Sequence, residues 1–243
     1  MTATLATPDL SELARFDTPT ISNVIELFGV QPQTAGYMDR NIRCCFARSR
    51  PMVGYACTAT YRSAEPPAAG VPTCEVAHLV EAFPTVPGPA VVVFEDLDDP
   101  PAAACFGELA CRTYKAFGAV GMVTSGAGRD LDQVEALDFP VFSTSTICSH
   151  GYGHLTSVGK PVQIGGITVR PGDLLHGDRN GVVVIPRNIA PHVAGIAAEI
   201  MDAEKVVIDY LNHAAPPTVD GYRAVIRDMQ DLLEHIRLRL QTL

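Results

Sequence analysis

Three charged residues are the strongest candidates for chemistry in this sequence. Glu108 opens a stretch with helical spacing of apolar residues, and Arg129 and Asp130 close a glycine-rich turn that follows a short apolar strand. The order loop, helix, strand, loop is expected to bring Glu108 close to the other two. Backbone N–H groups at the helix start and Arg129 suit a carboxylate, and the acids suit a hard metal ion. On composition alone, the alternative is a solvated turn, with Glu108 complementing the helix dipole.

The elements that must position these residues follow from spacing. Leu109, Ala110, Thr113, Ala116 and Phe117 recur at helical intervals, and Gly118 is a suitable stop. Residues 119–124 then predict a strand, and residues 125–128 a loop at its end. Upstream, residues 53–62 and 90–94 predict strands rich in β-branched residues.

The stretch from Gly107 to Asp130 begins with GEL and ends with GAGRD, and twenty residues separate Glu108 from Arg129. This pattern resembles the class II pyruvate aldolases of the RraA-like superfamily, which are 4-hydroxy-4-methyl-2-oxoglutarate / 4-carboxy-4-hydroxy-2-oxoadipate aldolases. The segments DTPTISNVIELFG and VRPGDLLHGDRNGVVVIP also resemble that superfamily. The resemblance spans roughly residues 13–211.

The resemblance implies a layered α/β protein with the swivelling β/β/α architecture of RraA-like proteins and helical N- and C-terminal segments. The repeated short strands with two glycine-rich turns suit such a fold, and no GxGxxG opens a Rossmann βαβ unit. Residues 1–215 are expected to form the RraA-like domain. Residues 216–243 predict an amphipathic helix that packs on another subunit of a homotrimer or homohexamer.

The resemblance also implies roles for individual residues. Asp130 would bind Mg²⁺ or Mn²⁺ directly, and Glu108 would hold the ion through coordinated water. Arg129 would contact a small 2-oxo acid and stabilise its enolate, while N–H groups around Gly107, Leu109 and Ala110 would hold the carboxylate. A neighbouring subunit's C-terminal helix would supply a further acid through water. Glu204 is the first choice for that acid, and Glu199 is the second.

The predicted reaction is the cleavage of a 4-hydroxy-2-oxo acid to pyruvate and a second oxo compound, which makes the protein a lyase. Loss of CO₂ from oxaloacetate gives the same enolate, so a side activity as an oxaloacetate decarboxylase is expected. A lysine Schiff base is the other route to such chemistry, but Lys115 and Lys160 have no evident apolar pocket beside the acids. The metal route therefore fits better.

Two alternatives remain. RraA itself binds and inhibits a ribonuclease and lacks the acid twenty residues before the Arg-Asp pair, so Glu108 favours an enzyme. A lyase of the same fold that acts on an unrelated oxo acid is the other alternative. Residues 148–154 and the acidic run of residues 95–99 would then set its specificity.

Both of these loops also raise the question of metal binding. Cys148, His150 and His154 are zinc-type side chains, but glycines separate the two histidines and no fourth ligand lies nearby. We therefore interpret this loop as polar, with His150 a candidate substrate contact. The acidic run of residues 95–99 is interpreted as a solvated loop after a strand.

Composition sets the broad class. The formal net charge of -9 disfavours nucleic acid as a partner, because contact with phosphates needs a basic surface. Seven cysteines without a CxxC pair favour a reducing compartment. The first sixteen residues lack the pattern of a signal peptide, and no apolar run is long enough for a membrane span. A cytoplasmic protein that does not interact with membranes is expected.

Overall fold

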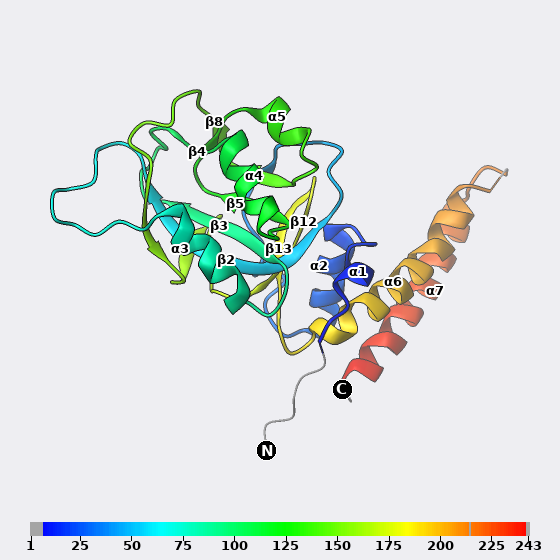
Figure 1. Cartoon of the computed structure of the whole chain (residues 1–243). Coiled ribbons are helices and arrows are strands. Elements are labelled where there is room, and N and C mark those ends of the chain that lie inside the picture. The colour runs from blue at the N-terminus through cyan, green and yellow to red at the C-terminus, as the bar shows by residue number, and fades with distance from the viewer. Residues whose placement is uncertain (1–6, 214, 242–243) are drawn as a thin grey trace, which may run out of the picture. The chain divides into compact units, whose positions relative to one another are not determined.

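The computed structural model of the chain describes residues 7–213 and 215–241 (Figure 1). The chain divides into two compact units. One contains residues 34–187 and carries the sheets, and the other joins the residues up to Gln33 to those from Asn188 onward. Among the described residues, every helix is too short or too polar to cross a bilayer. The first sixteen residues are those predicted to lack a signal peptide. Residues 1–6 among them lie outside the described residues.

The helical unit contains α1 (Leu10–Leu13), α2 (Thr18–Phe28), α6 (Ala190–Leu211) and α7 (Val219–Leu240). Residues of α2 and its flanks account for both of its ends, because Asp17 or Thr18 can cap a helix, Pro19 suits its first turn and Gly29 suits its end. The Asp17 carboxylate accepts the N–H of Thr20 at 2.9 Å, and Pro19 lies in the first turn, where a missing N–H costs nothing. Gly29 ends the helix in the left-handed conformation, with φ of 64°.

The C-terminal helix α7 packs along α6 of the same chain (Figure 1). Ile236 and Leu240 are buried, and Arg239 donates to Glu199 of α6 at 2.6 Å. The amphipathic helix predicted for residues 216–243 therefore packs against α6 of its own chain. Contact with another subunit, and the domain limits given above, stay predictions.

The main sheet of the other unit has eight strands, in the order β1-β7-β5-β3-β2-β12-β13, with β9 also paired to β2. The four central neighbours β2, β3, β5 and β7 run parallel. The strands are β1 (Arg43–Cys44), β2 (Met52–Arg62), β3 (Ala90–Asp96), β5 (Gly121–Thr124), β7 (Val141–Ser143), β9 (His154–Val158), β12 (Leu174–Asp178) and β13 (Gly181–Ile185). The predicted layered α/β fold is confirmed.

Both faces of this sheet are buried, which explains the unbroken apolar run in β3. Val92 and Phe94 enter a core cluster that also contains Tyr114 of α4 (Glu108–Ala116). Val91 and Val93 point to the opposite face, into a second cluster with Phe142. A parallel strand covered on both sides reads as a continuous apolar segment rather than an alternating one.

Smaller elements complete this unit. The helices are α3 (Val76–Ala82), α4 (Glu108–Ala116) and α5 (Leu131–Glu135), with a 3-10 turn at Phe83–Thr85. A hairpin joins β10 (Val162–Ile164) to β11 (Ile167–Val169). A separate parallel sheet has the order β4-β6-β8 and consists of Ala104–Phe106, Ala127–Gly128 and Ser145–Thr146. The loop predicted for residues 125–128 thus contains a short strand.

Two local predictions are wrong. The spacing of Val76, Ala77, Val80 and Phe83 predicts a short helix capped by Thr73, but Glu75, two residues later, is the N-cap of α3. The acidic run of residues 95–99 is not simply solvated, because Asp96 ends β3 and Asp98 is nearly covered. The Asp98 carboxylate accepts the N–H groups of Ser63 and Ala64 at 2.6 and 2.9 Å, so backbone donors replace water around the charge.

Replacing Asp17 with alanine tests the helix cap. Asp17→Ala removes the acceptor for the Thr20 N–H, and we expect the free energy of unfolding to fall by about 1 kcal/mol. Asp17→Asn keeps a side-chain oxygen at the same place and is expected to retain most of the stability. Urea unfolding of both variants measures the difference, and equal losses in the two would contradict the assignment.

Candidate active site at the end of the small parallel sheet

Strand pairing brings the predicted site segments together. Phe106 of β4 is in register with Gly128 of β6, and the N–H of Arg129 donates to the Phe106 carbonyl at 3.1 Å. Both strands run in the same direction, so the residues that follow them leave at the same edge of the sheet. Gly107 and α4 therefore begin beside Arg129 and Asp130.

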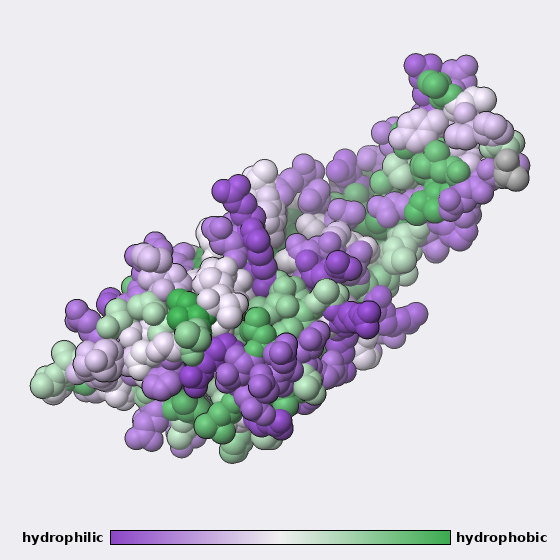
Figure 2. All heavy atoms as spheres, turned by 90° about the horizontal axis from the view of Figure 1, so that it is seen from above, coloured by the Kyte–Doolittle hydropathy of each residue, from purple (hydrophilic) through white to green (hydrophobic). Residues whose placement is uncertain are grey.

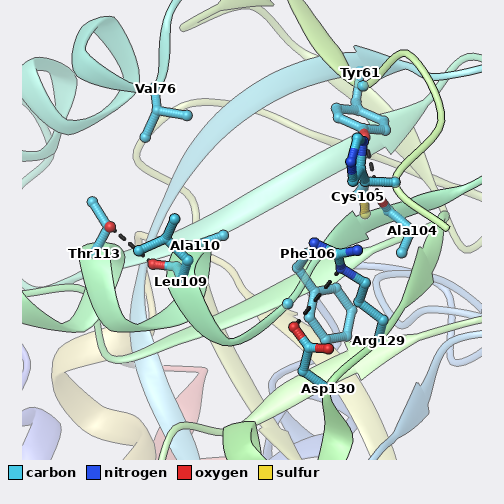
Figure 3. A pocket seen from close by; sticks show the side chains of 13 residues that line it. Tyr61, Val76, Ala104, Cys105, Phe106, Leu109, Ala110, Thr113, Arg129 and Asp130 are labelled. Atoms are coloured by element: carbon cyan, nitrogen blue, oxygen red, sulfur yellow. Dashed lines mark hydrogen bonds and ion pairs between the residues drawn. The ribbon is translucent and has the colours of Figure 1, made fainter. Parts of the chain in front are cut away.

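Asp130 joins the two segments directly. Its Oδ2 atom accepts the N–H of Glu108, the first residue of α4, at 3.1 Å. The same oxygen lies 3.8 Å from Nε of Arg129 (Figure 3). Asp130 has a left-handed backbone, with φ of 56°, and caps α5. About a third of each side chain remains exposed, 36% for Arg129 and 39% for Asp130, so both groups can reach a ligand.

Two glycines make this close approach sterically feasible. A Cβ atom at Gly107 would lie 2.6 Å from Oδ2 of Asp130 and 3.1 Å from Cγ of Arg129. A Cβ atom at Gly128 would overlap the ring of Phe106, at 2.0 Å. A side chain at Gly107 would push the charged pair away from the start of α4, and one at Gly128 would displace the Phe106 ring.

A cavity of about 580 Å³ opens beside this pair. Its wall combines aromatic and aliphatic side chains with the charged pair at one end (Figure 3). It is lined by Tyr61, Val76, Ala104, Cys105, Phe106, Gly107, Leu109, Ala110, Thr113, Arg129, Asp130, His150 and Gly153. A second hollow of about 380 Å³ shares Arg129 and Asp130 and also includes Thr146 and Cys148. Five predicted site residues, Gly107, Leu109, Ala110, Arg129 and Asp130, therefore surround one cavity.

The carboxylate of Glu108 is not among the groups that line the cavity. Nε of Arg112, one helical turn later, donates to its Oε1 atom at 2.8 Å, and Nη2 of the same guanidinium lies 2.8 Å from that oxygen in an ion pair. The backbone of Glu108 thus touches Asp130 while its side chain forms an ion pair on the surface. The predicted role of Glu108 in holding a metal through water stays a prediction.

The two acids predicted to act across a subunit boundary lie on α6. Glu199 is bonded through both carboxylate oxygens to Arg239 of its own chain, at 2.6 and 2.7 Å. Glu204 is half-buried and forms no ion pair with the described residues. Its carboxylate is therefore the more available of the two, and its role stays a prediction.

The donor set at the cavity suits a hard cation better than zinc. Within the described residues, no group of three or more His, Cys, Asp or Glu side chains is placed to hold a metal. Asp130 is the one carboxylate among the lining residues, and its Oδ1 atom has no hydrogen bond to a described residue. Magnesium keeps several waters and binds through one or two carboxylates, so this residue fits such an ion.

Several cavity residues were not predicted from the sequence. Tyr61 is one of them, because the sequence pattern of a buried strand does not show which of its aromatic rings lines a cavity. Its hydroxyl donates to the Ala104 carbonyl at 3.1 Å, and burial raises its pKa. Phe106 and Thr113 are others. His150, predicted as a substrate contact, does line the cavity, and Nδ1 of His154 is bonded to the Tyr152 carbonyl.

Asp96, the last residue of β3, is only 8% exposed. Its Oδ1 atom accepts the N–H of Asp98 at 3.0 Å, whereas Oδ2 has no partner among the described residues. Burial raises the pKa of this carboxyl to about 6. The folded chain therefore favours the neutral form of Asp96 more than water does.

A family model described as RraA-like (Aldolase/RraA) matches residues 9–184. Among curated proteins, the chain is 34% identical over 113 residues to a protein of Halalkalibacterium halodurans named "Putative 4-hydroxy-4-methyl-2-oxoglutarate aldolase". That match covers 46% of this chain and 53% of the relative. A protein of Ectopseudomonas mendocina with the same name is 29% identical over 119 residues, covering 46% and 70%. The chain therefore spans about half the length of the first of these relatives.

Solved structures share the fold. An uncharacterized protein from Pseudomonas syringae pv. tomato superimposes with a TM-score of 0.69 at 25% identity, covering 92% of this chain and 99% of the other. Streptomyces coelicolor RraAS2, described as an unusual member of the RNase ES inhibitor RraA protein family, gives a TM-score of 0.65 at 22% identity. It covers 83% of this chain and 98% of its own, and this likeness concerns the fold alone.

The burial of Asp96 predicts a pH effect on stability. Between its ordinary pKa of 3.8 and about 6, the folded chain holds a proton that the unfolded chain has released. The contribution of this group to the free energy of unfolding therefore falls as the pH rises through that window. Asp96→Asn is expected to gain stability relative to the wild type as the pH is raised from about 4 to about 7. Urea unfolding at several pH values measures this gain.

The matched control is Asp202→Asn, which removes an exposed carboxylate of α6. Its stability should follow the pH dependence of the wild type. The predicted effect would be contradicted if Asp96→Asn and the wild type differed in the free energy of unfolding by the same amount at every pH in this range.

Proposed function

The chain belongs to the RraA-like (Aldolase/RraA) family, and we propose that it is a metal-dependent aldolase that releases pyruvate from a 4-hydroxy-2-oxo acid. The observation that carries the proposal is Arg129 beside Asp130, at the end of a cavity that the first turn of α4 also borders. The names of the relatives from Halalkalibacterium halodurans and Ectopseudomonas mendocina support the same reaction class.

The reaction needs stabilisation of a negative charge at one oxygen. The C4 hydroxyl loses its proton, the C3–C4 bond breaks, and C4 becomes the carbonyl carbon of the second product. The bonding electrons pass through C3 to the C2 carbonyl, which leaves the enolate of pyruvate. A proton added at C3 then completes pyruvate. Cationic and N–H groups placed at the C2 oxygen before the reaction lower the barrier.

Residues of this chain supply those groups in the proposed complex. The Arg129 guanidinium has several donors in a planar fork that suits a carboxylate or an enolate. The N–H groups of Leu109 and Ala110 belong to the first turn of α4, where helices leave such donors unpaired. They would hold the C1 carboxylate, and the helix dipole favours an anion there.

Asp130 would hold Mg²⁺ or Mn²⁺ through its free Oδ1 atom, and Glu108 and a neighbouring chain's Glu204 would contribute through water. When bound, the ion supplies Lewis-acid stabilisation of charge on the C2 oxygen. Arg129 would contact the same oxygen, and its positive charge would offset the negative charge of the Asp130 carboxylate. If Glu204 acts in this way, the working enzyme is an oligomer, and we propose a homotrimer or homohexamer.

The proposed reaction is tested by coupling pyruvate release to lactate dehydrogenase. We expect pyruvate from 4-hydroxy-4-methyl-2-oxoglutarate and from oxaloacetate with Mg²⁺ present, and loss of both activities with EDTA. Excess Mg²⁺ should restore them. Absence of pyruvate from both substrates with Mg²⁺ present would refute the proposal. Two alternatives would then be left to test, a lyase of the same fold that acts on an unrelated oxo acid and a non-catalytic, RraA-type regulator of a ribonuclease.

Arg129→Ala should reduce pyruvate release by about 10²- to 10³-fold, the usual cost of losing a donor to a developing oxyanion. Arg129→Lys keeps the charge but not the planar fork, so we expect only partial recovery. Circular dichroism and urea unfolding should show an intact fold in both. Unchanged turnover in the alanine variant would contradict the assigned role.

Glu108 can be tested against its ion-pair partner. Glu108→Ala should slow turnover and raise the Mg²⁺ concentration needed for half-maximal activity. Arg112→Ala removes the partner in this ion pair but leaves the Glu108 carboxylate free. It should therefore not raise the Mg²⁺ concentration needed for half-maximal activity. If both variants need the same Mg²⁺ concentration for half-maximal activity, Glu108 acts only in a surface ion pair.

A further inference from the structure

We propose that His150 takes the proton from the C4 hydroxyl of the substrate when the C3–C4 bond breaks. This inference rests on the proposed function, because it assigns a further catalytic residue to the same reaction. The reaction needs a group that receives the hydroxyl proton. Arg129 and the N–H groups at the start of α4 cannot receive it, because they are donors only.

The loop that carries His150 is attached to the cavity wall on both sides of this residue. On one side, the Ser149 carbonyl accepts the N–H of Ala104 in β4 at 2.8 Å. On the other side, the N–H of Tyr152 donates to the carbonyl of Ser63, the residue after β2, at 3.0 Å. The backbone of His150 is therefore held near the end of β4 where Ala104 lies.

Two glycines allow this loop to lie against the end of β2. A Cβ atom at Gly153 would lie 2.0 Å from the Tyr61 hydroxyl, and one at Gly151 would lie 2.7 Å from the Ser63 carbonyl oxygen. Gly151 also has φ of 49°, in the left-handed region that favours glycine. The N–H of Gly153 donates to the carbonyl of His150 itself at 3.1 Å. These contacts hold the loop, and His150 with it, at the cavity.

The distance between the two ends of β4 suits the length of the substrate. Ala104 begins this strand and Gly107 follows it, so the two residues are about 10 Å apart along the chain. The C1 carboxylate would lie at the Gly107 end, beside Arg129. C1 and C4 are three bonds apart, or about 4 Å in an extended chain, and a hydrogen bond of about 3 Å at each end adds most of the remainder. A substrate held by Arg129 therefore directs its C4 hydroxyl toward His150.

The side chain of His150 has a ring nitrogen left for a ligand. Nδ1 lies 2.9 Å from the Gly151 carbonyl, whereas Nε2 has no hydrogen bond to a described residue. Imidazole is the side chain that enzymes use most often for proton transfer. Burial raises the pKa of Tyr61 and raises that of Cys105 to about 12. These two lining groups therefore stay protonated near neutral pH and do not act as the base.

The cavity is open to water, which can carry the proton away. His150 is exposed, and Val76 and Leu109, which also line the cavity, are exposed to 43% and 80%. The loop after β8 lies at the top of Figure 1, and hydrophilic side chains are interspersed with hydrophobic ones on the face seen from above (Figure 2). The imidazole can thus release the hydroxyl proton to solvent, and C3 takes up a proton from water to complete pyruvate.

Two reactions of the same site separate this role from a structural one. Cleavage of 4-hydroxy-4-methyl-2-oxoglutarate needs loss of the hydroxyl proton, whereas decarboxylation of oxaloacetate releases CO₂ from C4 and needs no base there. His150→Gln should lower kcat/KM for cleavage at least about 10²-fold and change that for decarboxylation less than about threefold. Equal losses in both reactions, or an unchanged rate of cleavage, would overturn the inference.

His154→Gln is the matched control. Nδ1 of His154 also lies close to a backbone carbonyl, that of Tyr152, at 2.8 Å, but this residue lines neither of the two hollows described above. The variant should retain both activities. A selective loss of cleavage as large as that in His150→Gln would contradict the assignment.

Exchange of the C3 protons of pyruvate in D₂O reports the enolate step alone. We expect His150→Gln to exchange these protons at the wild-type rate with Mg²⁺ present, as followed by proton NMR. A fall in exchange as large as the fall in cleavage would overturn the assignment of His150 to the C4 hydroxyl.

The two proposals fail in different ways. Absence of pyruvate from both substrates with the wild type would refute the aldolase and, with it, the role of His150. Pyruvate from both substrates, with equal losses in His150→Gln, would retain the aldolase and refute the role of His150 alone.

Discussion

The parallel pairing of β4 with β6 is the constraint on which the site depends. Two strands of three and two residues have little stability of their own, yet their register places Gly107 beside Arg129. One hydrogen bond from Arg129 to Phe106 and one from Glu108 to Asp130 then join the ends of both strands. The start of α4, a guanidinium and a carboxylate meet as a result. The larger sheet holds the surrounding chain, but it does not itself carry these groups.

The sequence predicts much of this arrangement where local chemistry decides. The caps of α2 at Asp17 and Gly29 and the apolar run of β3 are visible as patterns, because each depends on neighbours in the chain. The glycines of the β10–β11 hairpin are visible for the same reason. The fold was predicted through the GEL and GAGRD segments, whose likeness to a known family says more than composition does.

Other features depend on contacts that no local pattern contains. Asp96 and Asp98 look like a solvated charge run, but Asp96 is buried and distant backbone groups donate to the Asp98 carboxylate. The Glu108 side chain turns to Arg112, a rotamer choice that helical spacing allows but does not require. Strands β6 and β8 have two residues each, which is too short to show an alternation of apolar and polar residues. The aromatic wall at Tyr61 arises from tertiary packing alone.

The two glycines beside the charged pair and the exposed side chains of the cavity wall lead to a practical consequence. At Gly107 and Gly128 even a methyl group collides with its surroundings, so the charged end of the cavity tolerates almost no variation. Val76 and Leu109, in contrast, project into open space. The candidate site therefore combines a sterically constrained charged end with an adjustable entrance. Variant libraries aimed at new ligands can change the side chains of Val76 and Leu109 while the charged pair and its two glycines are kept.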